Sequence, residues 1–98
     1  MPDTVVVFAH LHAKPGQGAA VRAALERCQG PTRDEPGCEV YDLHVAVGDP
    51  DSIMMYEIWQ SEAALERHRV APHLDILREA TANLLAEPNR VMVSTRVS

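Results

Sequence analysis

The sequence of 98 residues predicts one α+β domain spanning residues 1–98, with the ferredoxin-like order β-α-β-β-α-β and helices on one face of an antiparallel sheet. Three observations lead to this fold class. Runs of β-branched and alternating apolar residues recur near the start, the middle and the end. An alanine-rich stretch with helical spacing separates the first two, and a second helical stretch, interrupted by proline, precedes the last.

The first strand and the first helix follow from their apolar patterns. Residues 5–13 begin with Val5-Val6-Val7-Phe8 and then alternate, which is typical of a strand that is apolar on both faces. Lys14-Pro15-Gly16 ends this strand, and residues 17–29 then predict an amphipathic helix that Gly30-Pro31-Thr32 breaks. The apolar stripe of that helix consists of Val21, Leu25 and Cys28.

A β-hairpin is expected in the middle of the chain. Glu35-Pro36-Gly37 forms a turn before a strand over residues 38–45, and Gly48-Asp49-Pro50-Asp51 is the loop to a strand over residues 52–59. The side chains expected on one side of the first hairpin strand are Tyr41, Leu43 and Val45.

The second helical region has clear start and stop signals. Ser61 is a suitable N-cap for a helix over residues 62–70, and Pro72 interrupts that helix but can occupy the first turn of a following one. Residues 87–89 end the second piece. Its expected buried stripe is Leu74, Leu77, Ala80 and Leu84, and the closing strand carries Val91, Val93, Thr95 and Val97.

Both faces of the sheet are expected to be apolar, although helices can cover only one. A second sheet covering the other face would bury it, so the sequence predicts a homodimer with isologous symmetry. The residues opposite Val5, Val7, Ile53 and Trp59 are Val6, Phe8, Met54, Tyr56 and Ile58.

Composition excludes several partners. Fourteen acidic and nine basic side chains give a formal charge of -5, which disfavours nucleic acid. Cys28 and Cys38 are too few for a disulfide scaffold and are expected to be reduced thiols. With no signal-peptide pattern and no long apolar run, we expect a soluble cytoplasmic protein without membrane contact.

A candidate pocket is suggested by the second hairpin strand. Met55, Glu57 and Trp59 share one strand face, so a carboxylate and an indole project together beneath the interrupted helix. Trp59 can stack on an aromatic ligand, although a core anchor is an equally good interpretation. A partly buried Glu57 can act as a base, but a structural hydrogen-bond or ion-pair role is favoured.

His68 and His73 flank the interruption at Pro72, where a helix end and a pocket are expected to meet. Either imidazole can transfer protons near neutral pH. The alternative, that an imidazole caps the interrupted helix, is stronger for His73.

His10 and His12 have the H-x-H spacing of some metal sites. A site needs a third ligand, and His44 could contribute only if its strand presents it on that face. A polar patch in a dimer cavity is the favoured interpretation, so no metal is predicted. Gly16-Gln17-Gly18 lacks the third glycine of a nucleotide-binding loop, and no acyl-enzyme motif is present.

The chain resembles the antibiotic biosynthesis monooxygenase family in three segments: Glu35-Pro36-Gly37-Cys38, Tyr41-Asp42-Leu43-His44, and Glu57 to His68 with Pro72-His73. This resemblance implies dimeric α/β barrels, with a pocket between sheet and helices in each subunit. It also implies oxygen insertion into quinols or aromatic polyketides without metal or flavin.

The residues also depart from that resemblance. Trp59 matches a pocket tryptophan of the polyketide-oxidising members, but Met55 and Leu65 stand where those members have asparagine and tyrosine. Haem-degrading relatives are disfavoured, because their key positions read Ala9, His68 and Arg78. A third branch, resembling isomerases of phosphorylated signalling sugars, is compatible with His68 and Pro72-His73.

The sequence therefore predicts a cofactor-independent monooxygenase that oxidises a small aromatic hydroquinone or phenol with dioxygen. The catalytic candidates are Trp59, His68 and His73, and Met55, Glu57 and His44 are the substrate-binding candidates. One alternative is an isomerase or lyase of a small polar metabolite, which requires pocket cations that the strands do not supply. The other is a non-enzymatic small-molecule-binding dimer.

Overall fold

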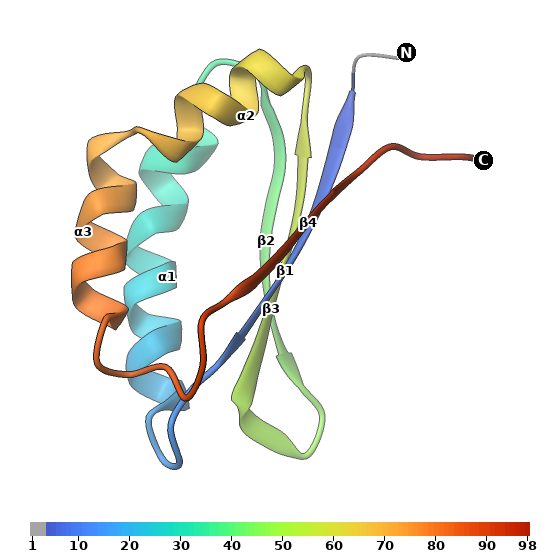
Figure 1. Cartoon of the computed structure of the whole chain (residues 1–98). Coiled ribbons are helices and arrows are strands. Elements are labelled where there is room, and N and C mark those ends of the chain that lie inside the picture. The colour runs from blue at the N-terminus through green and yellow to red at the C-terminus, as the bar shows by residue number, and fades with distance from the viewer. Residues whose placement is uncertain (1–3) are drawn as a thin grey trace.

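The computed structural model describes residues 4–98, which form a four-stranded antiparallel sheet with three helices on one face (Figure 1). The strand order is β2-β3-β1-β4, so the first and last strands of the chain are neighbours. The predicted α+β class and element order are confirmed. The elements are β1 (Val5–His12), α1 (Gly18–Arg33), β2 (Cys38–Ala46), β3 (Asp49–Trp59), α2 (Glu62–Arg69), α3 (Pro72–Thr81) and β4 (Arg90–Ser94).

The predicted alternation of the central strands is correct. In the β1–β3 pair Val7 lies opposite Glu57 and Phe8 lies opposite Tyr56. Val7 is 1% exposed and Glu57 7%, whereas Phe8 is 52% exposed. Since successive side chains point to opposite faces, the first pair faces the helices and the second faces away from them.

Helix α1 does not end where the sequence predicted. It continues through Gly30-Pro31-Thr32 to Arg33, although Pro31 cannot donate a backbone hydrogen bond. Tertiary contacts hold this last turn in place. Thr32 is fully buried, and Arg33 donates from Nε and Nη2 to the carbonyl oxygen of Tyr41 at 3.2 and 3.0 Å.

The hairpin loop is shorter than predicted, because β3 begins at Asp49 instead of Ser52. Gly48 takes the turn with φ +84°, a conformation that favours glycine. Asp51 then fixes the strand entrance, since its carboxylate accepts hydrogen bonds from the backbone N–H groups of Gly16 and Gly18 at 3.1 and 2.9 Å.

The interruption at Pro72 is confirmed, and it separates α2 from α3. The Ser61 hydroxyl caps α2 by accepting from the Ala64 N–H at 3.1 Å. Helix α3 ends at Thr81, earlier than predicted, and Thr81 is buried where Ala80 was expected. The Thr81 hydroxyl donates a hydrogen bond to the Leu77 carbonyl oxygen at 2.9 Å, so this polar side chain can be buried on the apolar side of α3.

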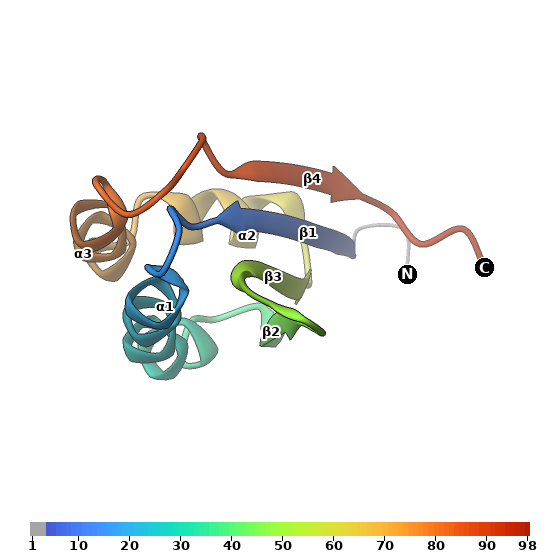
Figure 2. The same cartoon turned by 90° about the horizontal axis from the view of Figure 1, so that it is seen from below.

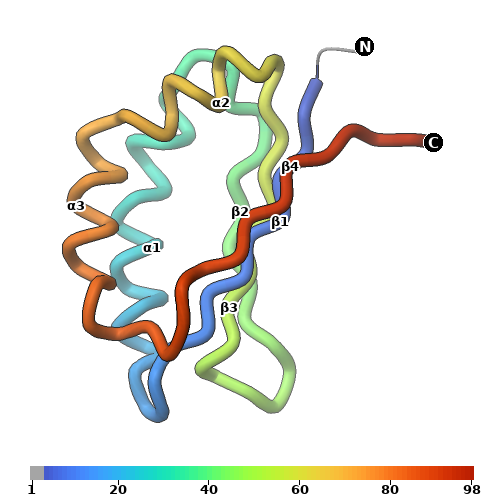
Figure 3. The backbone as a smooth tube through the Cα atoms, in the orientation of Figure 1, coloured from blue at the N-terminus to red at the C-terminus, as the bar shows by residue number. Residues whose placement is uncertain are grey.

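The layers explain where a site can form. Helices α1 and α3 run side by side across the sheet, and α2 crosses one end of it (Figures 2 and 3). Strand β4 ends at Ser94, so Thr95 and Val97, which were expected in the closing strand, lie beyond it. Among residues 4–98, no helix is long and apolar enough to span a membrane.

Candidate functional site

A cavity of about 420 Å³ lies between the sheet and helices α2 and α3. Its deep wall contains buried residues from three strands, including Val7, Tyr41, Met55 and Glu57. Its mouth is lined by exposed residues from α2, α3 and the segment leading into β4: Arg69, Arg78, Ala82, Asn89 and Val91. The interior of the cavity is therefore mostly apolar with a few polar side chains, and its entrance carries charged side chains.

His68 is the imidazole that lines this cavity. Its Nδ1 lies 2.7 Å from Glu35 Oε2, and Nε2 of His73 lies 2.8 Å from the same oxygen. A carboxylate can only accept hydrogen bonds, so it holds the proton of His68 on Nδ1 and leaves Nε2 as an acceptor. No hydrogen-bond partner of Nε2 lies among the described residues, and Nε2 is not a fully buried atom, so it keeps some exposed surface in a residue that lines the cavity.

Three neighbouring elements position this cluster. His68 is in the last turn of α2 and His73 in the first turn of α3, on the two sides of the Pro72 interruption. Glu35 is in the turn after α1, where its backbone N–H donates to the Thr32 carbonyl at 3.0 Å. The continuation of α1 through Pro31 thus carries Glu35 to the histidines.

Aromatic side chains surround His68. The Trp59 ring centroid lies 4.6 Å from that of His68, and the Tyr41 ring centroid lies 5.5 Å away in an edge-on arrangement. Burial lowers the pKa of His68 from its ordinary value, and the hydrogen bond to Glu35 opposes that change. The imidazole is consequently neutral at neutral pH and can accept a proton there.

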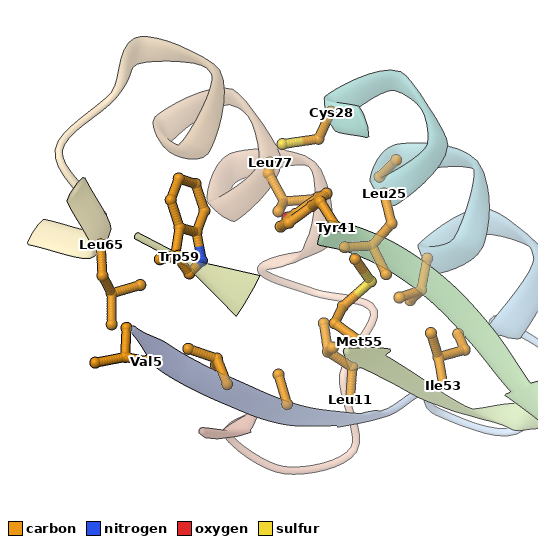
Figure 4. Packing of buried hydrophobic residues seen from close by; sticks show 14 of the residues in the cluster. Val5, Leu11, Leu25, Cys28, Tyr41, Ile53, Met55, Trp59, Leu65 and Leu77 are labelled. Atoms are coloured by element: carbon orange, nitrogen blue, oxygen red, sulfur yellow. The ribbon is translucent and has the colours of Figure 1, made fainter. Parts of the chain in front are cut away.

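Glu57 and Trp59 form a second buried pair. The indole Nε1–H donates to Glu57 Oε1 at 2.9 Å, and Trp59 is fully buried (Figure 4). Burial raises the pKa of Glu57, while the hydrogen bond from Trp59 and the charge of Arg69 act in the opposite direction. Glu57 lines the cavity but Trp59 does not, so the indole supports the wall from behind.

The remaining predicted site residues are divided between the two sheet faces. Met55 lines the cavity, as expected for a substrate-binding residue. His44 is exposed and pairs with Met54, on the sheet face away from the helices, so it does not reach the cavity. The face of His44 follows from the strand parity that buries Tyr41.

His10 and His12 also lie on the outer face. Their rings stack with centroids 6.2 Å apart, but His10 Nε2 hydrogen bonds to Ser52 Oγ at 2.7 Å. His12 instead approaches Glu87, with Nδ1 and Oε1 3.5 Å apart. Within residues 4–98, the three donors that are close enough to hold a metal ion are Glu35, His68 and His73, whose ligand atoms lie within 4.8 Å of one another. Both histidine nitrogens are also at hydrogen-bond distance from the same carboxylate oxygen.

A family model described as antibiotic biosynthesis monooxygenase matches residues 4–83 of this chain. The chain belongs to this family. "Putative monooxygenase Rv0793" of Mycobacterium tuberculosis is 36% identical over 93 residues, covering 95% of this chain and 91% of that protein. "Probable quinol monooxygenase YgiN" of Escherichia coli K12 is 33% identical over 95 residues, covering 87% of this chain and 91% of that protein.

Solved structures agree with this assignment to the antibiotic biosynthesis monooxygenase family. The crystal structure of PA3566 from Pseudomonas aeruginosa has a TM-score of 0.91 and 30% identity, covering 98% of this chain and 96% of that chain. The structure of Rv0793 from Mycobacterium tuberculosis has a TM-score of 0.89 and 34% identity, covering 97% of this chain and 96% of that chain.

Sequence reasoning missed four residues of the cavity region in this family member. Glu35 was taken as part of a turn and Tyr41 only as a residue on one side of its strand, while Arg69 and Arg78 were not predicted as pocket residues. A usable signal existed for the arginines. They occupy the last turns of α2 and α3, the same helical region that was expected to cover the pocket.

Proposed function

We propose that this chain is an oxygen-dependent monooxygenase of small aromatic hydroquinones or phenols and that His68 is its base. The observation that carries the proposal is the Glu35–His68 pair, in which Nδ1 of an imidazole that lines a cavity of about 420 Å³ lies 2.7 Å from the carboxylate, so that Nε2 is left without a partner among the described residues. Membership of the monooxygenase family supports the same reaction class.

The reaction follows from the placement of one base beside an apolar wall. His68 Nε2 removes the proton of a phenolic hydroxyl, and the electron-rich ring anion then transfers electrons to dioxygen. For a hydroquinone, one oxygen atom enters the ring and the other leaves as water, giving a hydroxyquinone. The proton held by His68 returns to the oxygen that leaves, so the protein ends in its starting state.

Glu57, Met55 and Trp59 have supporting roles in this proposal. Met55 packs against the ring, and Glu57 hydrogen bonds a substrate hydroxyl from the cavity wall. Trp59 positions Glu57 through their 2.9 Å hydrogen bond and packs against His68. His73 acts behind His68, because its Nε2 binds the Glu35 oxygen that orients the base.

The homodimer expected from the sequence is part of the same proposal. Phe8 and Met92 are 52% and 70% exposed on the sheet face that carries no helix, and the Phe8 ring lies 5.5 Å from that of Tyr56. An exposed apolar sheet face of this kind favours pairing with a second copy.

Oxygen uptake with a panel of substituted hydroquinones tests the reaction. We expect uptake by the wild type and a loss of at least about 100-fold in His68→Gln, because general-base catalysis contributes roughly that much. His12→Gln is the matched control, since His12 lies on the outer face, and it should retain the wild-type rate. Wild-type protein that consumes no oxygen with any member of the panel would refute the proposal.

A second candidate function has one observation in its favour. An isomerase or lyase of a small polar metabolite requires cations in the pocket, and Arg69 and Arg78 place them at the cavity mouth. Conversion of such a metabolite under argon by the wild type, lost in His68→Gln, would favour this candidate over the oxygenase. A ligand that binds and remains unchanged in air and under argon would instead indicate a binding protein.

A further inference from the structure

Two exposed arginines line the cavity. Arg69 is the last residue of α2 and Arg78 lies on α3, and both line the cavity while remaining exposed. Arg78 Nη2 donates to the Arg69 carbonyl oxygen at 2.8 Å, which ties the two residues together across the Pro72 interruption. This bond holds the Arg78 guanidinium at the C-terminal end of α2.

Each guanidinium is oriented by one acid on its own helix. Arg69 Nη1 lies 2.6 Å from Glu66 Oε1, and Arg78 Nη1 lies 3.1 Å from Asp75 Oδ1. These acids are largely exposed, with side chains 65% and 73% accessible, so solvent screens their charges. A guanidinium has five N–H donors, and one acid leaves several of them available to a ligand.

The positive charge acts on the interior of the cavity. Arg69 is close enough to lower the pKa of buried Glu57, and Arg78 is close enough to lower that of His68. Among the described residues that line the cavity, Glu57 is the sole carboxylic acid. A ligand group at the mouth thus meets two cations and the amide of Asn89, without an acid from the lining beside it.

We propose that the cavity mouth is a subsite for a carboxylate carried by the aromatic substrate, bound by Arg69 and Arg78. The substrate then has two ends: a phenolic hydroxyl deep in the cavity at His68, and an anionic substituent at the entrance. This inference deepens the proposed function, because it names the class of hydroquinone that the enzyme selects. Planar carboxylates suit guanidinium groups, which present paired N–H donors in a fixed geometry.

Anaerobic binding measurements test this subsite independently of turnover. The probes are 2,5-dihydroxybenzoate and its methyl ester, which share the ring and both hydroxyls and differ in charge at one position. Calorimetric titration of the wild type should give a dissociation constant at least about 10-fold lower for the acid than for the ester, as expected for a charge-assisted contact. This preference should weaken as salt concentration rises.

Variants assign the preference to the arginines. Arg78→Gln and the double variant with Arg69→Gln should reduce the acid-to-ester ratio to about 1, while Arg78→Lys should retain part of it because a cation remains. Arg22→Gln is the matched control. Arg22 is also an exposed, ion-paired helix arginine, with Nε 3.7 Å from Glu26 Oε1, but it does not line the cavity, and its loss should leave the ratio unchanged.

The outcomes separate the two proposals. Equal binding of acid and ester by the wild type, absence of acid binding, or a preference that survives in the double variant would overturn the subsite. Selective acid binding without oxygen uptake on any hydroquinone would leave the subsite in place and remove the oxygenase function. Oxygen uptake on unsubstituted hydroquinone without a preference for the acid would leave the oxygenase function in place and remove the subsite.

Discussion

At the scale of single residues, burial determines how the candidate site can react. His68 and Glu57 line the same cavity, and burial changes both of their pKa values in the direction of the neutral form. Each has one fixed partner, Glu35 for His68 and Trp59 for Glu57. The result is two polar groups with defined hydrogen-bond geometry beside a largely apolar space, and burial favours the uncharged form of each.

The raised pKa of Glu57 predicts a pH dependence of stability. The folded state binds the Glu57 proton more tightly than the unfolded state, so ionisation favours unfolding as pH rises above the ordinary value of 4.5. Glu57→Gln removes this effect. The free energy of unfolding of Glu57→Gln minus that of the wild type should therefore increase as pH rises from 4.5 through the raised pKa of Glu57.

Urea unfolding of both proteins between pH 4.5 and 7.5 measures this difference. Glu79→Gln is a suitable control, because Glu79 is exposed on α3 and lines neither the cavity nor the outer hollow, and its difference from wild type should stay flat over the same range. A Glu57→Gln difference that is constant or falls with rising pH would contradict the assignment.

At the scale of elements, the end of α1 connects the fold to the site. Gly30 and Pro31 are poor residues for the interior of a helix, yet the helix continues through both because Thr32 and Arg33 make tertiary contacts. Without this continuation, Glu35 would not reach the α2–α3 junction. Helix propensity is therefore overridden here by packing.

Two glycine substitutions should affect stability to different extents. Gly30→Ala should change the free energy of unfolding by less than about 1 kcal/mol, because the helix preference of alanine is opposed by contact of its Cβ with the ring of Pro31, and beyond its chain neighbours that Cβ meets nothing within 4 Å. Gly37→Ala should lower it, since Gly37 has φ +91° and its Cβ would lie 2.6 Å from Ala64 Cβ. Thermal unfolding followed by circular dichroism measures both, and an equal loss of stability in the two variants would contradict this difference.

At the scale of the whole molecule, the helices cover one sheet face, and no element formed by residues 4–98 covers the other (Figure 1). A hollow of about 980 Å³ on that outer face is lined by Val6, Phe8, Tyr56, Ile58 and residues of the C-terminal segment. The cavity lies on the helix side of the sheet and the proposed dimer contact on the opposite side, so dimerisation would leave the cavity open.

The proposed dimer predicts a change of mass in one variant. Wild-type protein should have twice the chain mass of 10.8 kDa in light scattering after size exclusion, and Phe8→Glu should shift it toward the monomer. Phe8 is half-exposed, so the variant should keep its helical signal. Val47→Glu, at a fully exposed position in the hairpin turn, should remain dimeric, and a monomeric wild type would exclude the dimer.

The sequence alone was sufficient for the order of the elements, the parity of the central strands and the helix interruption at Pro72. These depend on local periodicity and on turn residues that act within a few positions of themselves. The same information placed Met55, Glu57 and His68 at a pocket, because each lies on an element whose buried face the pattern identifies.

Only the tertiary structure decided how the site is assembled. The continuation of α1 through Pro31, the 2.7 Å contact of Glu35 with His68 and the convergence of Arg69 with Arg78 join segments that no local pattern connects. For the same reason the structure places His44 on the outer sheet face, away from the site, and Trp59 behind the cavity wall. Local sequence determines which face a side chain takes, but the packing of distant elements determines which side chains meet.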